Sequence, residues 1–183
     1  MVQSVELLLD DGATRAVRAD WRLLWEADIP SLARVTAETN RPHITLFVAQ
    51  TIPPEVDEAL RRAIGAPTIA IRSGGHVIFG GANLTLASSV VPSLALLNLH
   101  RQVWDTAHKV APTTLEVPRH IAPGKWTPHI TLSRRLPAHR LGEAVHLLAQ
   151  SGTARNEDVT WRGAALRRWD GDTKREWTLT EPC

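Results

Sequence analysis

The sequence contains the same five residues twice, and this repeat limits the possible folds more than any other feature. Pro-His-Ile-Thr-Leu occupies residues 42–46 and recurs at residues 128–132. In each half of the chain the predicted order is a strand, a helix, a long connection, the motif strand and then a helix that begins after a proline. A solenoid needs at least three repeats, so the two copies predict a duplicated lobe.

The pattern of apolar residues predicts a chain of mixed strands and helices. Apolar residues recur at helical spacing over residues 12–27, for example at Val17, Trp21 and Leu24. A loop with at most a short helical turn is expected at residues 29–40, and a proline-rich connection at residues 111–124. The other predicted helices lie at residues 53–65, from residue 92 onward and at 138–150. The predicted strands lie at residues 2–9, 43–50, 68–72, 76–79, 84–91, 129–135, 158–168 and 174–180.

The chain length fits one compact unit or two small lobes that share a core. We expect a single domain over residues 1–183, with lobes built from about residues 5–80 and 84–170. The terminal strand, residues 174–180, is expected to join one of them. Two similar α+β lobes that face each other form a cleft, and each lobe presents the same strand to it.

Composition limits the kind of protein and of partner. The net charge is +2, and the residues after 60 are mildly basic, which suits a small anionic ligand better than a long duplex. Ordinary solvated arginines are the alternative explanation. The single cysteine, Cys183, forms no intrachain disulfide and no thiolate zinc site. No apolar run approaches the ~20 residues of a membrane span, and residues 1–6 lack a signal-peptide pattern, so we expect a cytoplasmic monomer without membrane contact.

Alternation along a strand gives the repeated motif a polar and an apolar face. His43 and Thr45 share one face, and His129 and Thr131 share the corresponding face of the second copy. The isoleucine and leucine of each motif lie on the opposite face and are expected to pack on the helices. Both histidines and both threonines are therefore predicted to point into the cleft.

Two histidines and two hydroxyl groups around an anion suit phosphodiester chemistry. Cleavage of a cyclic phosphodiester needs one group to deprotonate water and another to protonate the leaving oxygen, and histidine serves both roles near neutral pH. Threonine hydroxyls can hydrogen-bond the non-bridging oxygens. This scheme requires neither a metal ion nor a cofactor, and none is expected.

The duplicated motif resembles the 2H phosphoesterase superfamily, which is named for two H-x-[ST]-x motifs. The closest resemblance is to the 2′-5′ RNA ligase-like proteins, also described as RNA 2′,3′-cyclic phosphodiesterases. The resemblance implies an α+β bilobal fold with pseudo-twofold symmetry, in which two antiparallel sheets flank the cleft and helices lie outside. It also implies metal-independent hydrolysis of 2′,3′-cyclic phosphate ends to 2′-phosphates, with 2′-5′ ligation in some members. By motif match, His43 and His129 are the acid–base pair, and Thr45 and Thr131 hold the phosphate.

Four further residues are candidates for substrate binding, each with an ordinary alternative. An arginine follows the second motif in several relatives, and Arg134 occupies that place, but strict alternation gives Arg135 the cleft-facing position. Trp126, just before the second motif, is placed to stack on a base or to pack in the core. Phe47 continues the first motif strand on the face of His43, so it is expected to line the cleft unless it belongs to the core.

We therefore expect a cyclic phosphodiesterase that acts on RNA ends or small cyclic nucleotides. One alternative is an RNA- or nucleotide-binding module with little or no turnover. A second is an enzyme that hydrolyses a cyclic phosphate on a non-RNA metabolite such as an ADP-ribose derivative. The sequence leaves open which histidine is the acid and whether ligation occurs.

Overall fold

The computed structural model describes residues 2–81, 83–113, 115–151 and 160–180. The first two residues of the predicted strand at 158–168 and Cys183 lie outside this part. The strands are β1 (Gln3–Leu9), β2 (His43–Ala49), β3 (Ala70–Ile71), β4 (Ser73–Gly80), β5 (Asn83–Val90), β6 (His129–Pro137), β7 (Trp161–Asp170) and β8 (Arg175–Thr178). The helices are α1 (Asp11–Glu26), α2 (Pro54–Ala63), α3 (Leu94–Val110) and α4 (Leu141–Ala149), with 3-10 turns at Leu32–Arg34, Arg119–Ile121 and Ala138–Arg140.

Local sequence explains where the helices begin and which face they bury. The carboxylate of Asp10 accepts a hydrogen bond from the Ala13 amide (2.7 Å) at the start of α1, and Ser93 caps α3 in the same way. Pro53 precedes α2, and Pro54 occupies its first turn, where a missing amide hydrogen has no cost. The predicted helix at 138–150 begins with a 3-10 turn and continues as α4.

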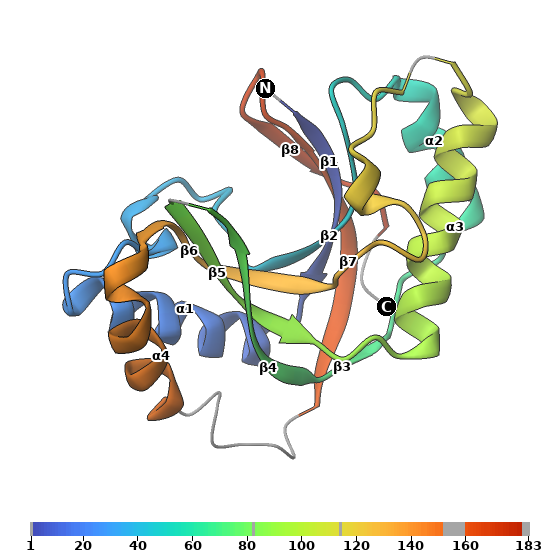
Figure 1. Cartoon of the computed structure of the whole chain (residues 1–183). Helices are drawn as coiled ribbons and strands as arrows, with labels where there is room; N and C mark the ends of the chain where they lie inside the picture. Colours follow the sequence, from blue (N-terminus) through green and yellow to red (C-terminus); the bar gives the residue numbers. More distant parts are fainter. Residues whose placement is uncertain (1, 82, 114, 152–159, 181–183) are drawn as a thin grey trace.

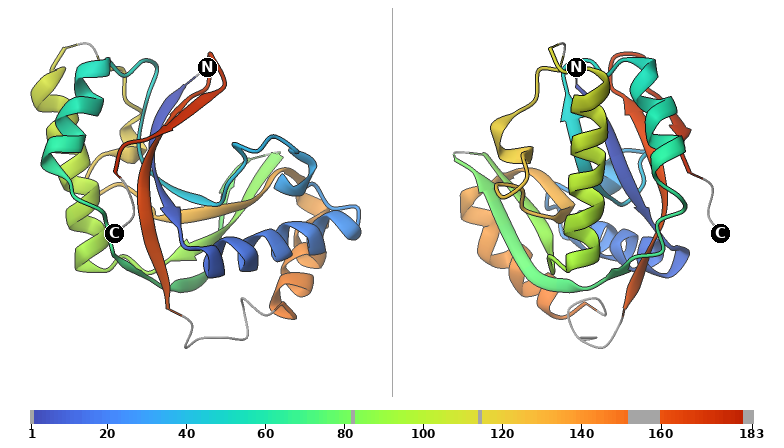
Figure 2. Two further views of the ribbon diagram at one scale, coloured as in Figure 1. Left: turned by 180° about the vertical axis from the view of Figure 1, so that it is seen from behind. Right: turned by 90° about the vertical axis from the view of Figure 1, so that its right-hand side faces the viewer.

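The strands form two antiparallel sheets, which confirms the predicted fold class. The first sheet has the order β2-β1-β7-β3, with β8 paired to β7, and the second has the order β4-β5-β6. Helices α2 and α3 pack together beside the first sheet, and α1 and α4 pack together beside the second (Figures 1 and 2). The buried apolar side chains form one continuous cluster that draws on both sheets.

The sheets do not follow the predicted lobe boundaries at residues 80 and 84. Strand β7 lies beyond residue 84 but pairs with β1, whereas β4 lies before residue 84 but pairs with β5. Helix α1 likewise packs on α4 and β6, beside the other half of the chain (Figure 1). The exchanged strands β7 and β4 cover the second edge of β1 and of β5, which would otherwise leave backbone groups unpaired.

The exchange leaves the two sheets with matching topology. In both, the motif strand lies at an edge, its hydrogen-bonded neighbour lies next, and the exchanged strand follows, as β2-β1-β7 and as β6-β5-β4. The edge strands β2 and β6 contact each other, so the two sheets meet along the repeated motifs. The fold therefore brings both motif histidines to one place.

Candidate active site

A cleft of about 1010 Å³ opens where β2 and β6 meet. His43 and Thr45 line it from β2, and His129 and Arg134 line it from β6. Trp126, in the connection before β6, lines it as well. The structure therefore brings most of the residues predicted from the sequence into one cavity, which we call the catalytic cleft.

The two histidines are held in the same way. The Nδ1 atom of His43 lies 2.7 Å from the carbonyl oxygen of Arg41, and Nδ1 of His129 lies 2.8 Å from the carbonyl oxygen of Thr127. A carbonyl only accepts hydrogen bonds, so in the neutral ring Nδ1 carries the proton and Nε2 is the free base. Each carbonyl belongs to a residue before proline, which is restricted to extended conformations, so the motif proline helps to position it.

His43 lies beside a buried ion pair. Nε2 of His43 lies 3.4 Å from Oε1 of Glu6, a carboxylate on β1 that is only 3% exposed. Oε2 of the same carboxylate accepts a hydrogen bond from Nε of Arg167 (2.7 Å), and Arg167 also pairs with Glu176. Burial raises the pKa of Glu6, but His43, Arg167 and the Ser4 hydroxyl together outweigh it and hold that pKa below its ordinary value. The carboxylate of Glu6 and the guanidinium of Arg167, which lies 3.5 Å from Nδ1 of His43, therefore flank this ring.

The surroundings of His129 are apolar and positively charged. The Phe79 ring lies 4.6 Å from the imidazole, centroid to centroid. Burial lowers the pKa of His129, the hydrogen bond to Thr127 opposes the shift, and His43, Arg134 and His120 lower it further. His129 is therefore the histidine that favours the neutral form.

Both motif strands carry a β-bulge at the same place, and it changes which residues face the cleft. On β2, Thr45 pairs with Glu6 but Phe47 pairs with Val5, so the intervening leucine is an extra residue. The same shift occurs on β6 between Thr131 and Ser133. A bulge of this kind reverses the alternation beyond it.

Two sequence-based predictions are corrected by the bulges. Phe47 is fully buried and packs edge-on against Trp104 and His108 of α3, so it does not line the cleft. Arg134 lines the cleft, whereas Arg135, which strict alternation favours, does not and has a positive φ of 58°. Arg134 is therefore the one of these two arginines that lines the cleft, and the alternation argument failed because it assumed a regular strand.

Two tryptophan side chains donate hydrogen bonds to the backbone carbonyl oxygens of the motif threonines. The indole of Trp126 donates to the carbonyl oxygen of Thr45 (3.1 Å), and the indole of Trp21 donates to that of Thr131 (3.0 Å). These bonds cover carbonyl groups of the two edge strands. Trp126 also stacks on His100 with ring centroids 4.0 Å apart, so it combines packing with a position in the cleft. Thr131 is half-buried on the strand of His129 but is not among the residues that line the cleft.

Comparison with known proteins identifies the family. The family model of the 2′-5′ RNA ligase superfamily matches residues 13–175, which is most of the chain. This chain belongs to the 2′-5′ RNA ligase superfamily. The 2H phosphoesterase resemblance drawn from the duplicated motif is thereby confirmed, and membership indicates an enzyme of the 2H phosphoesterase type. No curated protein matches the chain in sequence.

Solved structures share the fold at low sequence identity. Usb1 of Kluyveromyces marxianus covers 100% of this chain, with 98% of its own length aligned, 16% identity and a TM-score of 0.55. LigT of E. coli complexed with 3′-AMP covers 99%, with 93% of its own length aligned, 13% identity and a TM-score of 0.55. TT0787 of Thermus thermophilus covers 98%, with 95% of its own length aligned, 14% identity and a TM-score of 0.57. The superfamily fold therefore spans the whole chain.

Several residues of this superfamily member line the cleft without having been predicted. Glu6 had a signal in the sequence, since a lone acid in an otherwise mostly apolar strand lies on the face opposite Val5 and Leu7. Arg167 had none, because its partners lie far away in the chain. Phe79, His120 and Lys125 are further examples. Arg168, next to Arg167, points the other way and is held by Asp57 and Gln3 in the core.

Two kinds of feature are absent from the described part of this superfamily member, namely a cluster of metal ligands and a helix that could span a membrane. Among residues 2–81, 83–113, 115–151 and 160–180, no group of three or more His, Cys, Asp or Glu side chains is arranged to hold a metal ion. Within the same described part of the chain, no helix has both the length and the apolar character needed to cross a membrane.

Proposed function

We propose that this protein hydrolyses 2′,3′-cyclic phosphates of RNA ends or nucleotides to 2′-phosphates, with His129 as the general base and His43 as the general acid. The observation that carries the proposal is the pair of motif histidines in one cleft, each with Nδ1 held by a backbone carbonyl and Nε2 left for proton transfer. Coarser support comes from membership of the 2′-5′ RNA ligase superfamily.

The proposed reaction is an in-line displacement at phosphorus. Nε2 of His129 takes a proton from water as the water oxygen forms a bond to phosphorus. The bond from phosphorus to the 3′ oxygen breaks, and Nε2 of His43 gives its proton to that oxygen. The product carries a 2′-phosphate and a free 3′-hydroxyl. A 5′-hydroxyl that attacks in place of water would form a 2′-5′ linkage with the same acid and base.

The charges around each histidine support this division of roles. A general acid must carry a proton at the start, and the buried carboxylate of Glu6 lies 3.4 Å from Nε2 of His43. A general base must start neutral, and burial together with Arg134 keeps the pKa of His129 low. A carboxylate beside one histidine and an apolar, cationic setting around the other suit an acid and a base.

Arg134 and the two threonines are proposed to bind the phosphate. Arg134 is exposed and lines the cleft beside His129, where its guanidinium can hydrogen-bond non-bridging oxygens. Thr45 lines the cleft on the other motif strand. Thr131 does not line the cleft, and its proposed role rests on its place two residues after His129 in the motif. Hydrogen bonds that strengthen as charge builds up on these oxygens lower the barrier. Trp126 is proposed to contact the base or ribose at the cleft wall.

The test is turnover of a 2′,3′-cyclic mononucleotide, with the product position identified by NMR. His43→Ala and His129→Ala should each lower kcat by about 10²–10⁴, and His139→Ala, on an exposed turn outside the cleft, should change nothing. An aryl phosphodiester, whose leaving group needs no proton, separates the roles: His43→Ala should retain most of its activity on it and His129→Ala should not. Wild-type protein without turnover, or with a 3′-phosphate product, would contradict the proposal.

The pH profile provides a second test of the base. The pKa of His129 is lowered, so this ring stays neutral at pH values below the ordinary histidine range. The acidic limb of kcat/KM should therefore lie below the pH at which an unperturbed histidine titrates, near 6.5. An acidic limb above that value would argue against His129 as the base. Competition between RNA ends, cyclic mononucleotides and cyclic ADP-ribose derivatives then identifies the preferred substrate.

A further inference from the structure

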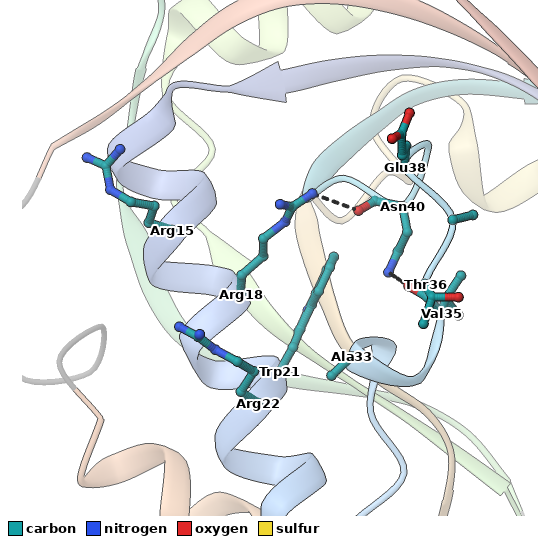
Figure 3. Close-up of a pocket in the computed structure, with 10 residues that line it drawn as sticks. Arg15, Arg18, Trp21, Arg22, Ala33, Val35, Thr36, Glu38 and Asn40 are labelled. Atoms are coloured by element: carbon teal, nitrogen blue, oxygen red, sulfur yellow. Dashed lines mark hydrogen bonds between the residues drawn. The ribbon is translucent and has the colours of Figure 1, made fainter.

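A second depression lies beside the catalytic cleft, between α1 and the loop that follows the first 3-10 turn (Figure 3). Arg15, Arg18 and Arg22 line one side of it from α1. The other side is formed by residues between 33 and 40. We call this feature the arginine groove.

The arginine groove is continuous with the catalytic cleft. Val35, Ala37, Glu38 and Asn40 line both cavities, so a ligand can leave one and enter the other over the same loop. Arg18 reaches across the groove to donate a hydrogen bond to the Asn40 carbonyl oxygen (3.3 Å), as Figure 3 shows. The groove therefore extends the cleft in one direction along α1.

The charge of the groove is unusual for this part of the chain. Residues 1–60 contain more acids than bases, yet three of their arginines fall on successive turns of one helix. All three side chains are exposed, and within the described part of the chain none has an ion pair. Glu38 is the one carboxylate among the residues that line the groove. Exposed guanidinium groups without carboxylate partners are available to bind an anionic ligand.

The length of the groove fits several phosphates rather than one. Seven residues of helix separate Arg15 from Arg22, a rise of roughly 10 Å at 1.5 Å per residue. A stacked strand carries one phosphate per about 3.4 Å of axis, so this distance covers about three of them. Trp21, the aromatic side chain in the groove wall, is 3% exposed and donates its indole hydrogen to Thr131. Base stacking therefore has no platform there, and contacts to phosphate dominate.

We propose that the arginine groove binds the phosphate backbone of the nucleotides that precede the reacting end of an RNA strand. This inference rests on the proposed function, because it places the terminal cyclic phosphate in the catalytic cleft. It adds a substrate preference: a polynucleotide end is favoured over a free mononucleotide, without preference for base sequence in the groove.

The test compares the variant Arg15→Gln/Arg18→Gln/Arg22→Gln with wild type. The matched control is Arg61→Gln/Arg62→Gln/Arg101→Gln, which removes the same charge from exposed positions of α2 and α3. Binding of a fluorescent oligoribonucleotide of roughly ten nucleotides ending in a 2′-phosphate, within the usual size range for single-strand sites, is measured by anisotropy across salt concentrations. The groove variant should bind about 10- to 100-fold more weakly near 0.1 M salt. Its plot of log affinity against log salt concentration should be shallower, with a slope smaller in magnitude by about 2. Glu38→Gln should bind more tightly than wild type.

Turnover separates this inference from the proposed function. The groove variant should lose kcat/KM on an oligonucleotide with a 2′,3′-cyclic phosphate and keep its activity on a cyclic mononucleotide. Unchanged oligonucleotide binding and salt slope, an equal loss in the control variant, or a parallel loss on the mononucleotide would each overturn the inference. If wild type hydrolyses neither substrate, the proposed function fails, whereas the anisotropy measurement still decides whether the groove binds RNA.

Discussion

Replacing Glu6 by glutamine tests the different roles of the two histidines. The substitution keeps the size of the side chain and removes a charge that lies 3.4 Å from Nε2 of His43. Two unit charges at that distance attract by about 1 kcal/mol at the permittivity of water and about 5 kcal/mol at an effective value of 20. Arg167 already neutralises part of the Glu6 charge, so the lower part of this range applies. We expect a loss of about 1.4 kcal/mol, which is about tenfold in rate.

The sign of the effect depends on which form of His43 reacts. As the general acid, His43 reacts in its protonated form, which the Glu6 carboxylate attracts. Glutamine keeps the shape of the side chain but removes that attraction, so kcat/KM should fall about tenfold on a substrate whose leaving group needs a proton. On an aryl phosphodiester, whose leaving group needs no proton, Glu6→Gln should change kcat/KM little. A loss confined to the substrate that needs the acid is therefore the expected result.

The assay compares kcat/KM on a 2′,3′-cyclic mononucleotide and on an aryl phosphodiester, with circular dichroism to establish that the protein is folded. Ser4→Ala is the matched control, because it removes a hydrogen bond to Oε1 of Glu6 (2.7 Å) but keeps the carboxylate. It should leave both rates close to those of wild type. An equal loss on both substrates in Glu6→Gln, or no loss on either, would refute the assignment of His43 as the acid.

Three further outcomes follow from the structure. Arg134→Gln should lower kcat/KM by about 10- to 100-fold, since a hydrogen bond to a charged group contributes about 1.5–3 kcal/mol, whereas Arg135→Gln should change it less than twofold; equal effects would contradict the bulge argument. Asp57→Asn should lower the free energy of unfolding in urea by about 3–5 kcal/mol, because it leaves the guanidinium of Arg168, at 2% exposure, with neutral acceptors only and without its charged partner. Glu58→Gln, in an exposed pair, is the control for Asp57 and should cost at most about 0.5 kcal/mol. Turnover should survive EDTA, and loss that a divalent ion restores would contradict a reaction carried by protein groups alone.

Much of the fold was predictable from local patterns. Strands and helices occur close to their predicted positions, and the loop at residues 29–40 contains the single short helical turn that was expected. Caps and prolines set the helix starts, and these are local interactions between residues a few positions apart. The pairing of β7 with β1 was not predictable in this way, because it joins residues from opposite ends of the chain.

Local sequence predicts which kinds of residue meet in the candidate site, and long-range contacts fix how they are arranged. The duplicated motif specified two histidines and two threonines, since alternation in a strand holds over the few residues from His43 to Thr45. Beyond that length the bulges reversed the alternation, which moved Phe47 into the core and Arg134 into the cleft. A bulge depends on how two strands pair, so it cannot be predicted from the sequence of one strand alone.

The asymmetry between the histidines also comes from tertiary structure alone. The motifs are identical, so the sequence makes the two rings equivalent. Glu6 reaches His43 from the neighbouring strand, and Arg167 reaches Glu6 from a strand more than a hundred residues further along the chain. The corresponding neighbour of Thr131 on β5 is Ala87, which has no charge to offer His129. Long-range strand pairing therefore decided which copy of an identical motif gained a carboxylate, and with it which histidine is suited to be the acid.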